Sequence, residues 1–445
     1  MNASSGKRVI VVGAGIAGLV AAHTLAQRGF SVRVLEAATR VGGRMTTDCV
    51  DGFVIDRGAQ FLSSEYPILL SLAQSLGLEP DLRVSSPWAG IVRNGRLCAV
   101  NGSDWLSPWR SGLLSFPEWL GLGARGWKLR ATSPRNRALN DYSQWAGCDT
   151  ESAATWGRRV LGPSATDYLL EPVLEGFYFQ EIEATSRALA EVVCGFFNAR
   201  RGRSLSLAGG LGRLPEALAA MLDVAVSTPV LALEHDGERV VVVTKTARFE
   251  ADHVILATTA SVAGRLHRRA DDVEQALLAT GYSANLNVAV MTRPDFRLLR
   301  GVEKMYGVLI PRRERRHVAA IGIEANKSRD RAAQGHLFNL MLSGRSSREI
   351  LAWPEPEIVH SILPELERLL PGVTAAVAAT HVYRWEEAEP LSPVGRARNL
   401  RQYRADVAAA ACPRVLLAGD YLSMPFTEGA AESGRWAAQA IARSG

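Results

Sequence analysis

Short runs of consecutive apolar residues, rich in branched side chains, recur along the chain. The first run, residues 8–12, is followed by a glycine-rich turn, by a helical pattern over 19–28 and by a second run over 31–36. A strand that is apolar on both faces is typical of a parallel sheet covered by helices. The N-terminal pattern therefore predicts a strand–helix–strand unit.

Strand and helix patterns alternate through the rest of the chain. Further strands are expected over 224–244, 253–257, 282–292, 306–323 and 415–420, and further helices over 65–80, 355–370 and 429–442. Asp236-Gly237 lies between two short strand patterns and is a hairpin signal. The alternation predicts a mixed α/β fold class.

Tryptophan is concentrated in residues 87–157. We expect this region to be helical, with Pro108 and Pro117 as breaks. Between residues 104 and 130 aromatic side chains alternate with arginine and lysine, a pattern that suits peripheral contact with a membrane surface. Because aromatic clusters are more often buried than exposed to lipid, we favour a helical cap that packs inward over a substrate cavity.

Charge and cysteine content exclude several classes of protein. Lys and Arg number 51 and Asp and Glu 45, a net charge of +6, and no dense basic segment suited to nucleic acid is present. The five cysteines are far apart and include no CxxC pair, so we predict no metal site, no disulfide framework and a cytoplasmic location. Glycines interrupt the apolar run over 9–22, so we expect neither a signal peptide nor a membrane-spanning helix.

A GxGxxG motif, made by Gly13, Gly15 and Gly18, lies between the first strand and the first helix. In such a motif the first glycine permits a tight turn, the second lets the backbone approach a pyrophosphate, and the third lets helix and strand pack closely. The start of the helix, at Ile16 and Ala17, offers N–H groups and the positive end of the helix dipole to phosphates. The motif predicts a dinucleotide-binding site.

The segment after the second strand supplies further candidate ligands for the dinucleotide. Glu36 ends this strand, where a carboxylate accepts hydrogen bonds from ribose hydroxyls. Gly42 and Gly43 keep the backbone close to the diphosphate, and Arg44 supplies charge-assisted hydrogen bonds. The candidate residues of this segment are Glu36, Ala37, Arg40, Gly42, Gly43 and Arg44.

Residues 36–44 resemble the extension of this motif in flavoproteins, in which the acid is followed by RxGGR. Residues 56–61 resemble a DxGxxF turn near the flavin, and residues 417–434 resemble a C-terminal flavin motif. Weaker similarity lies at 171–178, 209–215 and 228–230. Together these motifs resemble the flavin amine oxidase superfamily, which includes monoamine oxidases, protoporphyrinogen oxidases and phytoene- or squalene-type desaturases.

The resemblance implies noncovalent FAD, because no cysteine occupies the position of the covalent link that some monoamine oxidases have. It also implies a Rossmann-type FAD-binding domain with an interleaved substrate domain of mixed sheet and helices. The FAD-binding domain is expected over 1–80, 205–280 and 400–445, and the substrate domain over 81–204 and 281–399, with 87–157 as its Trp-rich helical cap.

The resemblance assigns roles to residues near the cofactor. Asp420 would bond a ribityl hydroxyl, and the start of the last helix would direct its N–H dipoles at the N1–C2=O edge of the flavin. Val230 would contact the adenine through its backbone. The cofactor residues implied in these segments are Gly58, Ala59, Gln60, Val230, Gly419, Asp420, Phe426, Thr427 and Ala430.

Three residues are the catalytic candidates that the resemblance implies. Asn287 takes the position where amine oxidases of this family usually place a lysine opposite flavin N5, and Lys304 is the nearest lysine. Trp385 matches a family aromatic residue near the flavin. Phe426 matches one of two rings that enclose the amine, whereas the second position, near residues 389–391, has no ring.

The implied reaction removes a hydride from a CH–N or CH–CH unit of a hydrophobic small molecule and passes electrons to O2 or to another external acceptor, such as a quinone. Aromatic residues at 177–179 and at Phe196 are candidate walls of a dry pocket. One alternative is a desaturase or a protoporphyrinogen oxidase-like enzyme at a membrane surface. A remote alternative is a non-catalytic lipid escort similar to Rab GDP-dissociation inhibitors, against which the complete cofactor motifs count. The substrate, the acceptor and the oligomeric state stay open.

Overall fold

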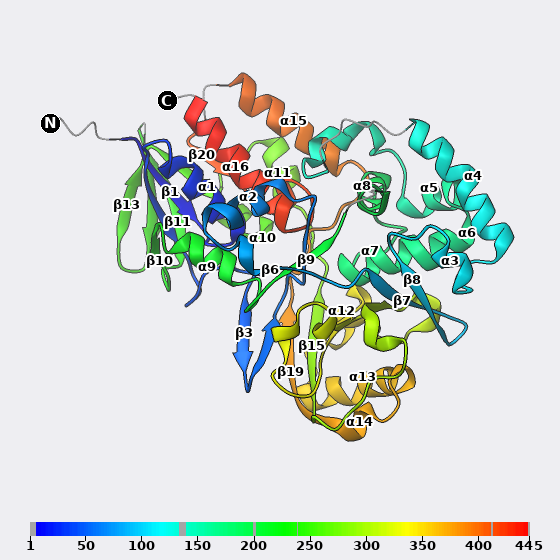
Figure 1. Ribbon diagram of the computed structural model, residues 1–445. Helices are drawn as coiled ribbons and strands as arrows, with labels where there is room; N and C mark the ends of the chain where they lie inside the picture. Colours follow the sequence, from blue (N-terminus) through cyan, green and yellow to red (C-terminus); the bar gives the residue numbers. More distant parts are fainter. Residues whose placement is uncertain (1–5, 133–138, 199–201, 238, 411–412, 444–445) are drawn as a thin grey trace.

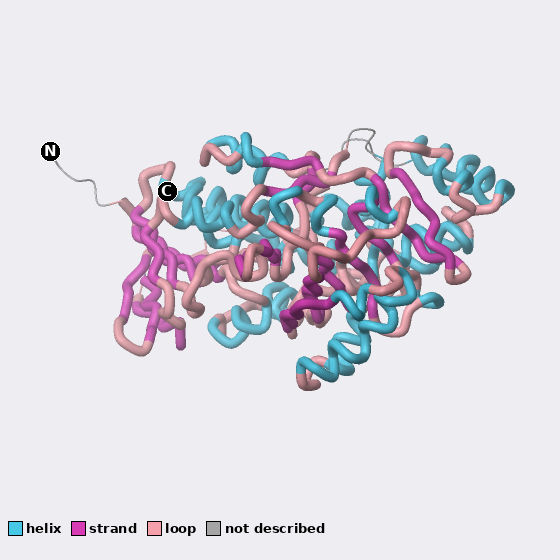
Figure 2. Tube along the Cα trace, turned by 60° about the horizontal axis from the view of Figure 1, so that its bottom comes forward, coloured by secondary structure: helices cyan, strands magenta, loops and turns pink. Residues whose placement is uncertain are grey.

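The computed structural model describes residues 6–132, 139–198, 202–237, 239–410 and 413–443. The molecule is elongated, with a sheet at one end and a group of helices at the other, and a second large sheet lies below their junction in the view of Figure 1. Figure 2 shows the same division from below, with strands gathered at the left end and helices at the right. The predicted mixed α/β fold class is confirmed.

The N-terminal strand–helix–strand unit forms the centre of a parallel sheet. Among the described residues the strand order is β10-β2-β1-β14-β20. The strands are β1 (Arg8–Val12), β2 (Ser31–Leu35), β10 (Asp223–Ala225), β14 (His253–Leu256) and β20 (Val415–Leu417). Each neighbouring pair runs parallel, and the apolar residues of β1 after Arg8 are buried because the sheet is covered on both faces.

Two helices from distant parts of the sequence pack together on this sheet. They are α1 (Ile16–Ala26) and α16 (Thr427–Arg443), drawn in blue and red in Figure 1. Gly434 lies so close to α1 that an added Cβ would overlap Ala17 O. A smaller antiparallel sheet contacts β1 and β14 and contains the predicted hairpin. Its strands are β11 (Val230–Asp236), β12 (Arg239–Thr244) and β13 (Arg248–Ala251).

The second large sheet is mixed. In the described part of the chain its order is β19-β15-β18-β17-β16-β7-β8, and the β16–β7 pair alone is parallel. The strands are β7 (Trp88–Arg93), β8 (Arg96–Asn101), β15 (Asn285–Thr292), β16 (Met305–Leu309), β17 (Val318–Ile323), β18 (Leu337–Leu342) and β19 (Val377–Trp385). Its buried side chains pack against α13 (Glu355–Leu369), close to the predicted helix, and form a second core. Two short helices, α12 (Gly344–Ile350) and α14 (Val373–Ala376), flank it.

The start of the tryptophan-rich region differs from the prediction. Residues 88–101 form the β7–β8 hairpin and not a helix. The turn residues Asn94 and Gly95 have φ values of 52° and 70°, as a two-residue hairpin turn requires. The aromatic content of the region obscured this Asn-Gly signal.

Most of the region after this hairpin is helical, as predicted. Its helices are α3 (Ser107–Arg110), α4 (Phe116–Thr132) and the start of α5 (Ala153–Val160). Beyond residue 157 follow α6 (Pro163–Ala165), α7 (Glu171–Phe177) and α8 (Arg187–Asn198). Trp145 and Trp156 pack inward, but Trp105 is 50% and Trp109 40% exposed, so the expectation of an inward-packed cap is wrong at these two residues. The prediction for the side chains of residues 127–130 lies outside what the structure describes.

The predicted division into two domains stays a prediction, and its boundaries cross regular elements. The boundary at residue 400 lies inside α15 (Arg396–Ala409), and a small sheet joins segments from both sides of the boundaries near residues 80 and 205. That sheet contains β5 (Leu62–Ser63), β6 (Leu82–Val84) and β9 (Ser204–Leu207). The other elements are β3 (Thr47–Val50), β4 (Phe53–Asp56), α2 (Pro67–Ser75), α9 (Arg213–Ala219), α10 (Ala260–Leu266) and α11 (Asp272–Leu278). None of the helices in the described ranges combines the length and the apolar character needed to cross a bilayer.

Candidate active site

The glycines of the GxGxxG motif form the turn between β1 and α1. Gly13 has a φ of 103°, which suits glycine, and an added Cβ would lie 2.7 Å from Ala257 O. Gly18 packs so closely on the turn that its Cβ would overlap Gly13 O. At Gly15 an added Cβ would meet no described atom within 4 Å. The space in front of the helix start, at Ile16, is therefore open to a ligand.

Glu36 holds this turn from the end of β2. Its Oε2 accepts a hydrogen bond from Ala14 N at 2.6 Å, and its Oε1 accepts one from Ala38 N at 2.8 Å. Its carbonyl accepts a hydrogen bond from the loop that leads into β11, which begins at Val230. Ala37 and Val230 therefore lie near one edge of the parallel sheet, and the predicted ribose and adenine contacts stay predictions.

The segment after Glu36 returns to the glycine turn. Gly42 forms a backbone bridge with Gly15, and an added Cβ on Gly43 would lie 3.6 Å from Gly15 Cα. Arg40 is engaged by β3, because its Nη1 donates to Asp48 Oδ1 at 2.6 Å. The two glycines thus lie where a diphosphate is expected, whereas a contact from Arg40 would have to compete with Asp48.

Arg44 and Asp420 form an ion pair between the two ends of the predicted cofactor site. Arg44 Nη1 lies 2.7 Å from Asp420 Oδ2 and donates to Ala388 O at 2.6 Å, while Arg44 O accepts from Ala59 N at 2.9 Å. Burial alone would lower the pKa of Arg44, but the attraction of Asp420 and Glu389 raises that pKa above its usual value. Asp420 Oδ1 is buried and has no hydrogen-bond partner among the described residues, so it can accept a hydrogen bond from a ligand hydroxyl.

The start of α16 is fixed by contacts on both sides. The Glu428 carboxylate accepts hydrogen bonds from two N–H groups in the first turn of α2, at 2.8 and 3.0 Å. Ala430 N donates to Phe426 O at 3.0 Å, and Gly419 N donates to Ser433 Oγ at 2.9 Å. The N-terminal end of the helix, where a positive dipole end favours negative charge, is therefore held beside Asp420 and Phe426.

Asn287 and Trp385 meet at one backbone carbonyl. Asn287 Nδ2 donates to Arg57 O at 3.2 Å, and Trp385 Nε1 donates to the same oxygen at 2.9 Å. An added Cβ on Gly58 would lie 3.4 Å from the Trp385 ring. The structure therefore brings two of the catalytic candidates together at the turn that was expected to pass near the flavin.

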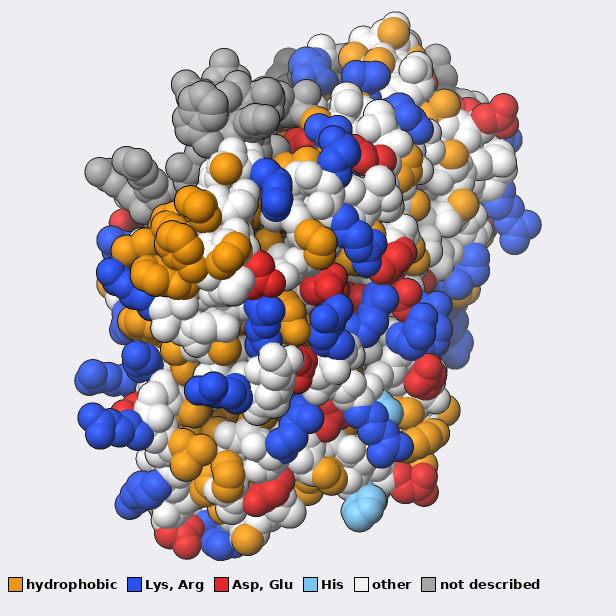
Figure 3. Space-filling view, turned by 90° about the vertical axis from the view of Figure 1, so that its right-hand side faces the viewer, with side chains coloured by type: hydrophobic (Ala, Val, Ile, Leu, Met, Phe, Trp, Pro, Cys, Tyr) orange, Lys and Arg blue, Asp and Glu red, His pale blue; other side chains and the backbone are white. Residues whose placement is uncertain are grey.

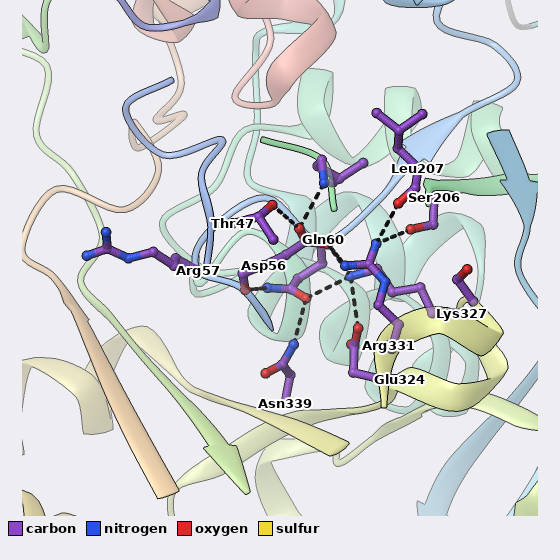
Figure 4. A network of polar contacts seen from close by, with 12 residues as sticks. Thr47, Asp56, Arg57, Gln60, Ser206, Leu207, Glu324, Lys327, Arg331 and Asn339 are labelled. Atoms are coloured by element: carbon purple, nitrogen blue, oxygen red, sulfur yellow. Dashed lines mark hydrogen bonds and ion pairs between the residues drawn. The ribbon is translucent and has the colours of Figure 1, made fainter. Parts of the chain in front are cut away.

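A buried polar network supports the same turn (Figure 4). Lys327 Nζ lies 2.8 Å from Asp56 Oδ2 and 3.2 Å from Glu324 Oε2, and Arg331 Nη1 lies 2.9 Å from Asp56 Oδ2. These four side chains are at most 1% exposed, and their formal charges balance. Gln60 Oε1 accepts from Lys327 Nζ at 3.3 Å, so this predicted cofactor residue faces the network.

Sequence analysis missed Lys327, which follows no motif. It lies between the short helices η6 (Glu324–Asn326) and η7 (Arg329–Arg331). Lys304, the nearest lysine to Asn287 in sequence, instead places its Nζ 3.9 Å from the centre of the Trp88 ring. Burial alone would raise the pKa of Asp56, but Lys327 and the neighbouring arginine hold it below its usual value. The rarity of lysine in this chain was the one feature of the sequence that could have drawn attention to Lys327.

Phe426 belongs to a cluster of four rings, of which Tyr66, Tyr178 and Phe426 are buried and Phe196 is partly buried. It stacks on Tyr66 with ring centres 5.4 Å apart and planes 1° apart. Phe196 lies edge-on to both rings, and Tyr178 has its ring centre 6.4 Å from that of Phe426. Tyr66 is thus the ring that stacks on Phe426, and the sequence did not point to it because it precedes α2, away from every motif.

A family model described as "Flavin containing amine oxidoreductase" matches residues 16–442. Protoporphyrinogen oxidase 2, chloroplastic/mitochondrial, from Arabidopsis thaliana is 25% identical over 448 residues, which cover 88% of this chain and 85% of that protein. Putrescine oxidase from Kocuria rosea is 52% identical over 71 residues, 16% of this chain and 15% of that protein. The structure of cyclohexylamine oxidase from Brevibacterium oxydans IH-35A shares the fold, with a TM-score of 0.76, 21% identity and coverage of 98% and 99%.

The family match begins inside the GxGxxG motif, at Ile16, and includes the segment of Glu36 to Arg44, the ring cluster and the segment of Asp420. It confirms the predicted resemblance, noncovalent FAD as the cofactor, and hydride removal from a small molecule with transfer of electrons to an external oxidant. It favours an enzyme over a lipid escort. The chain therefore belongs to the family of flavin-containing amine oxidoreductases and is an FAD-dependent oxidoreductase.

Proposed function

We propose that this enzyme oxidises a C–H bond next to nitrogen in an apolar small molecule. Phe426 carries the proposal, because it belongs to both parts of the site. Its carbonyl accepts a hydrogen bond from Ala430 in the first turn of α16, and its ring stacks on Tyr66. A substrate that the rings hold therefore lies beside the helix start that we expect at the flavin. The similarity to putrescine oxidase and to cyclohexylamine oxidase supports nitrogen as the neighbouring atom.

The residues at the predicted cofactor site fit FAD. The open space at Gly15 accommodates a pyrophosphate, and the unpartnered Oδ1 of Asp420 suits a ribityl hydroxyl. We propose that the glycine turn and Gly42-Gly43 hold the diphosphate, that Glu36 holds the ribose, and that the start of α16 faces the flavin. When bound, FAD supplies the hydride acceptor.

The side chains of this site orient the substrate and exclude water. The ring cluster is largely buried and aromatic, so it excludes water and holds the C–H bond of an amine in place. Asn287 and Trp385 both donate to Arg57 O, and neither side chain carries a proton that titrates near neutral pH. We therefore assign both to positioning the turn at residues 57–60.

Anaerobic reduction tests the proposed reaction. A panel of apolar amines should bleach the flavin of the purified enzyme, whereas alcohols of the same shape should not. Air admitted afterwards identifies the acceptor: reoxidation within seconds means O2, and reoxidation over minutes means a quinone-like acceptor. Flavin that no amine reduces, but that a porphyrinogen does, would contradict oxidation next to nitrogen in favour of oxidation between carbons.

An exposed aromatic patch favours a second candidate, an enzyme that works at a membrane surface. Trp105, Trp109, Phe116 and Leu120 are exposed on α3, α4 and the segment before them, and ring centres of Trp109 and Phe116 lie 5.5 Å apart. Figure 3 shows hydrophobic side chains gathered on this side of the molecule. Aromatic side chains suit the headgroup level of a bilayer. We propose peripheral membrane contact through residues 104–130.

Flotation with phosphatidylcholine vesicles tests this contact. Wild-type protein should float with the vesicles, and the double variant Trp109→Ser, Phe116→Ser should stay at the bottom of the gradient. Leu231→Ser and Met221→Ser, at exposed apolar residues elsewhere, serve as matched controls. Equal flotation of the patch variant and the controls would remove the membrane from the proposal and leave the amine reaction untouched.

A further inference from the structure

We propose that Glu389 binds the cationic nitrogen of an amine substrate beside the aromatic cluster. This inference rests on the proposed function and adds to it a substrate class: apolar amines that are protonated in solution. The segment of Glu389 is tied to Arg44 through Ala388 and to Tyr178 through Ser283, and Glu389 has no part in the predicted cofactor contacts.

The position of Glu389 is fixed by its backbone. Glu389 N donates to Ser283 Oγ at 3.3 Å, and Glu389 O accepts from Ser283 N at 2.9 Å. Ser283 Oγ also donates to Tyr178 O at 3.4 Å, which ties the segment to the ring cluster. The residues on either side are held as well, because Arg44 donates to Ala388 O and Gln180 Nε2 donates to Pro390 O at 3.1 Å. The carboxyl group is therefore presented by a rigid segment.

One oxygen of the Glu389 carboxyl group lacks a partner. Its Oε2 is buried and forms no hydrogen bond with any described residue. Each nearby cation is engaged elsewhere: Arg44 pairs with Asp420, and Arg396 donates to Ser392 Oγ at 2.8 Å and to the carbonyl of Asp420. A buried carboxylate without a partner is costly, so a ligand that brings a positive charge gains more here than at a paired site.

The surroundings of Glu389 favour a cation with an apolar remainder. The cluster of Tyr66, Tyr178 and Phe426 is aromatic, and the faces of aromatic rings attract ammonium groups. The negative charge of Glu389 acts on both tyrosine hydroxyls, which places the carboxyl group within electrostatic range of the cluster. A neutral hydrocarbon would leave the carboxyl group without a partner, whereas an ammonium group would supply one.

Burial, reinforced by the charge of Asp420, raises the pKa of Glu389 well above its usual value, although Arg44 and Arg396 oppose this shift. The titratable groups that face it from neighbouring segments also include Tyr66 and Tyr178. Because a raised pKa means that the charge is lost as pH falls through that pKa, ammonium binding should weaken on the acid side. A Gln at this position should remove that dependence.

Ligand titration of the FAD-loaded enzyme tests the inference. Benzylamine and benzyl alcohol are added to wild-type protein, to Glu389→Gln and to Glu386→Gln, and the shift of the flavin absorption spectrum gives each Kd. Glu386 lies three residues earlier and is exposed, so it is the matched control. We expect Glu389→Gln to raise the Kd of benzylamine by about 10- to 100-fold, the range for loss of a charged hydrogen bond. The Kd of benzyl alcohol should change less than about twofold.

The outcomes separate this inference from the proposed function. Equal binding of both probes to the wild type, or equal loss of both in Glu389→Gln, overturns the role of Glu389. Partial recovery of benzylamine binding in Glu389→Asp, with an unchanged Tm, supports it. If amines reduce the flavin and Glu389→Gln leaves KM unchanged, the inference fails while amine oxidation stands. If the wild type prefers benzylamine but no amine reduces the flavin, the binding site stands and amine oxidation fails.

Discussion

At the scale of single residues, the site depends on side chains whose partners lie far away in the sequence. Asp56 and Lys327 pair across 271 residues, and Gln60 and Asn339 across 279. The motif around Asp56 was visible in the sequence, but its partners were not, because nothing local marks them. Tyr66 was invisible for the same reason: only the packing of α2 against α16 places its ring on Phe426.

Lys327→Met should destabilise the enzyme by about 3–5 kcal/mol, the usual cost of leaving a buried charge without its partner. Asp56 and Glu324 would share only Arg331 as a counter-charge. Urea unfolding followed by circular dichroism measures the change. Lys304→Met, at an exposed lysine, should change stability by less than about 0.5 kcal/mol. A similar small effect at Lys327 would show that the network does not hold the turn.

At the scale of elements, the strands of the parallel sheet were predictable because they are apolar on both faces. The pattern of apolar positions also predicted α13 and α16, with each end correct to within two residues. The β7–β8 hairpin was not predicted, since its tryptophan and its neighbours suggested a helical cap and outweighed the Asn94-Gly95 turn. The tight turn at Gly13 and Gly18 was predictable because the spacing of the glycines is itself the constraint, whereas the exposure of Trp105 and Trp109 depends on tertiary packing.

Substitution of glycine by alanine should have opposite effects on stability at two helical positions, one in the α1–α16 contact and one in open space. Gly434→Ala should destabilise the enzyme, because its Cβ would overlap Ala17 O and push the helices apart. Gly126→Ala in α4, where an added Cβ meets no described atom within 4 Å, should stabilise it by about 0.5–1 kcal/mol. Differential scanning fluorimetry of both variants shows whether each substitution lowers or raises Tm. A stabilising Gly434→Ala would contradict the close packing.

At the scale of the whole molecule, the predicted cofactor site joins segments from both halves of the sequence. FAD should therefore stabilise the entire fold and not one part of it. With free FAD at 100 times its Kd, the gain is about 2.7 kcal/mol, and a single unfolding transition should move upward. Calorimetry of protein stripped of FAD, with and without added FAD, measures this shift. Two transitions, of which only one moves, would show that the two large sheets unfold independently.

The contact of Arg44 with Ala388 spans 344 residues, and this separation affects how the chain folds during its synthesis. A ribosome adds about 5–20 residues each second, so the early segment waits many seconds for its late partner. During that time the apolar face of α1 that later packs against α16 stays exposed, and chaperones can bind it. With Asp420 in its proposed role at the cofactor, the FAD site is complete only after translation has passed this residue, so cofactor supply affects the yield of active enzyme late in synthesis.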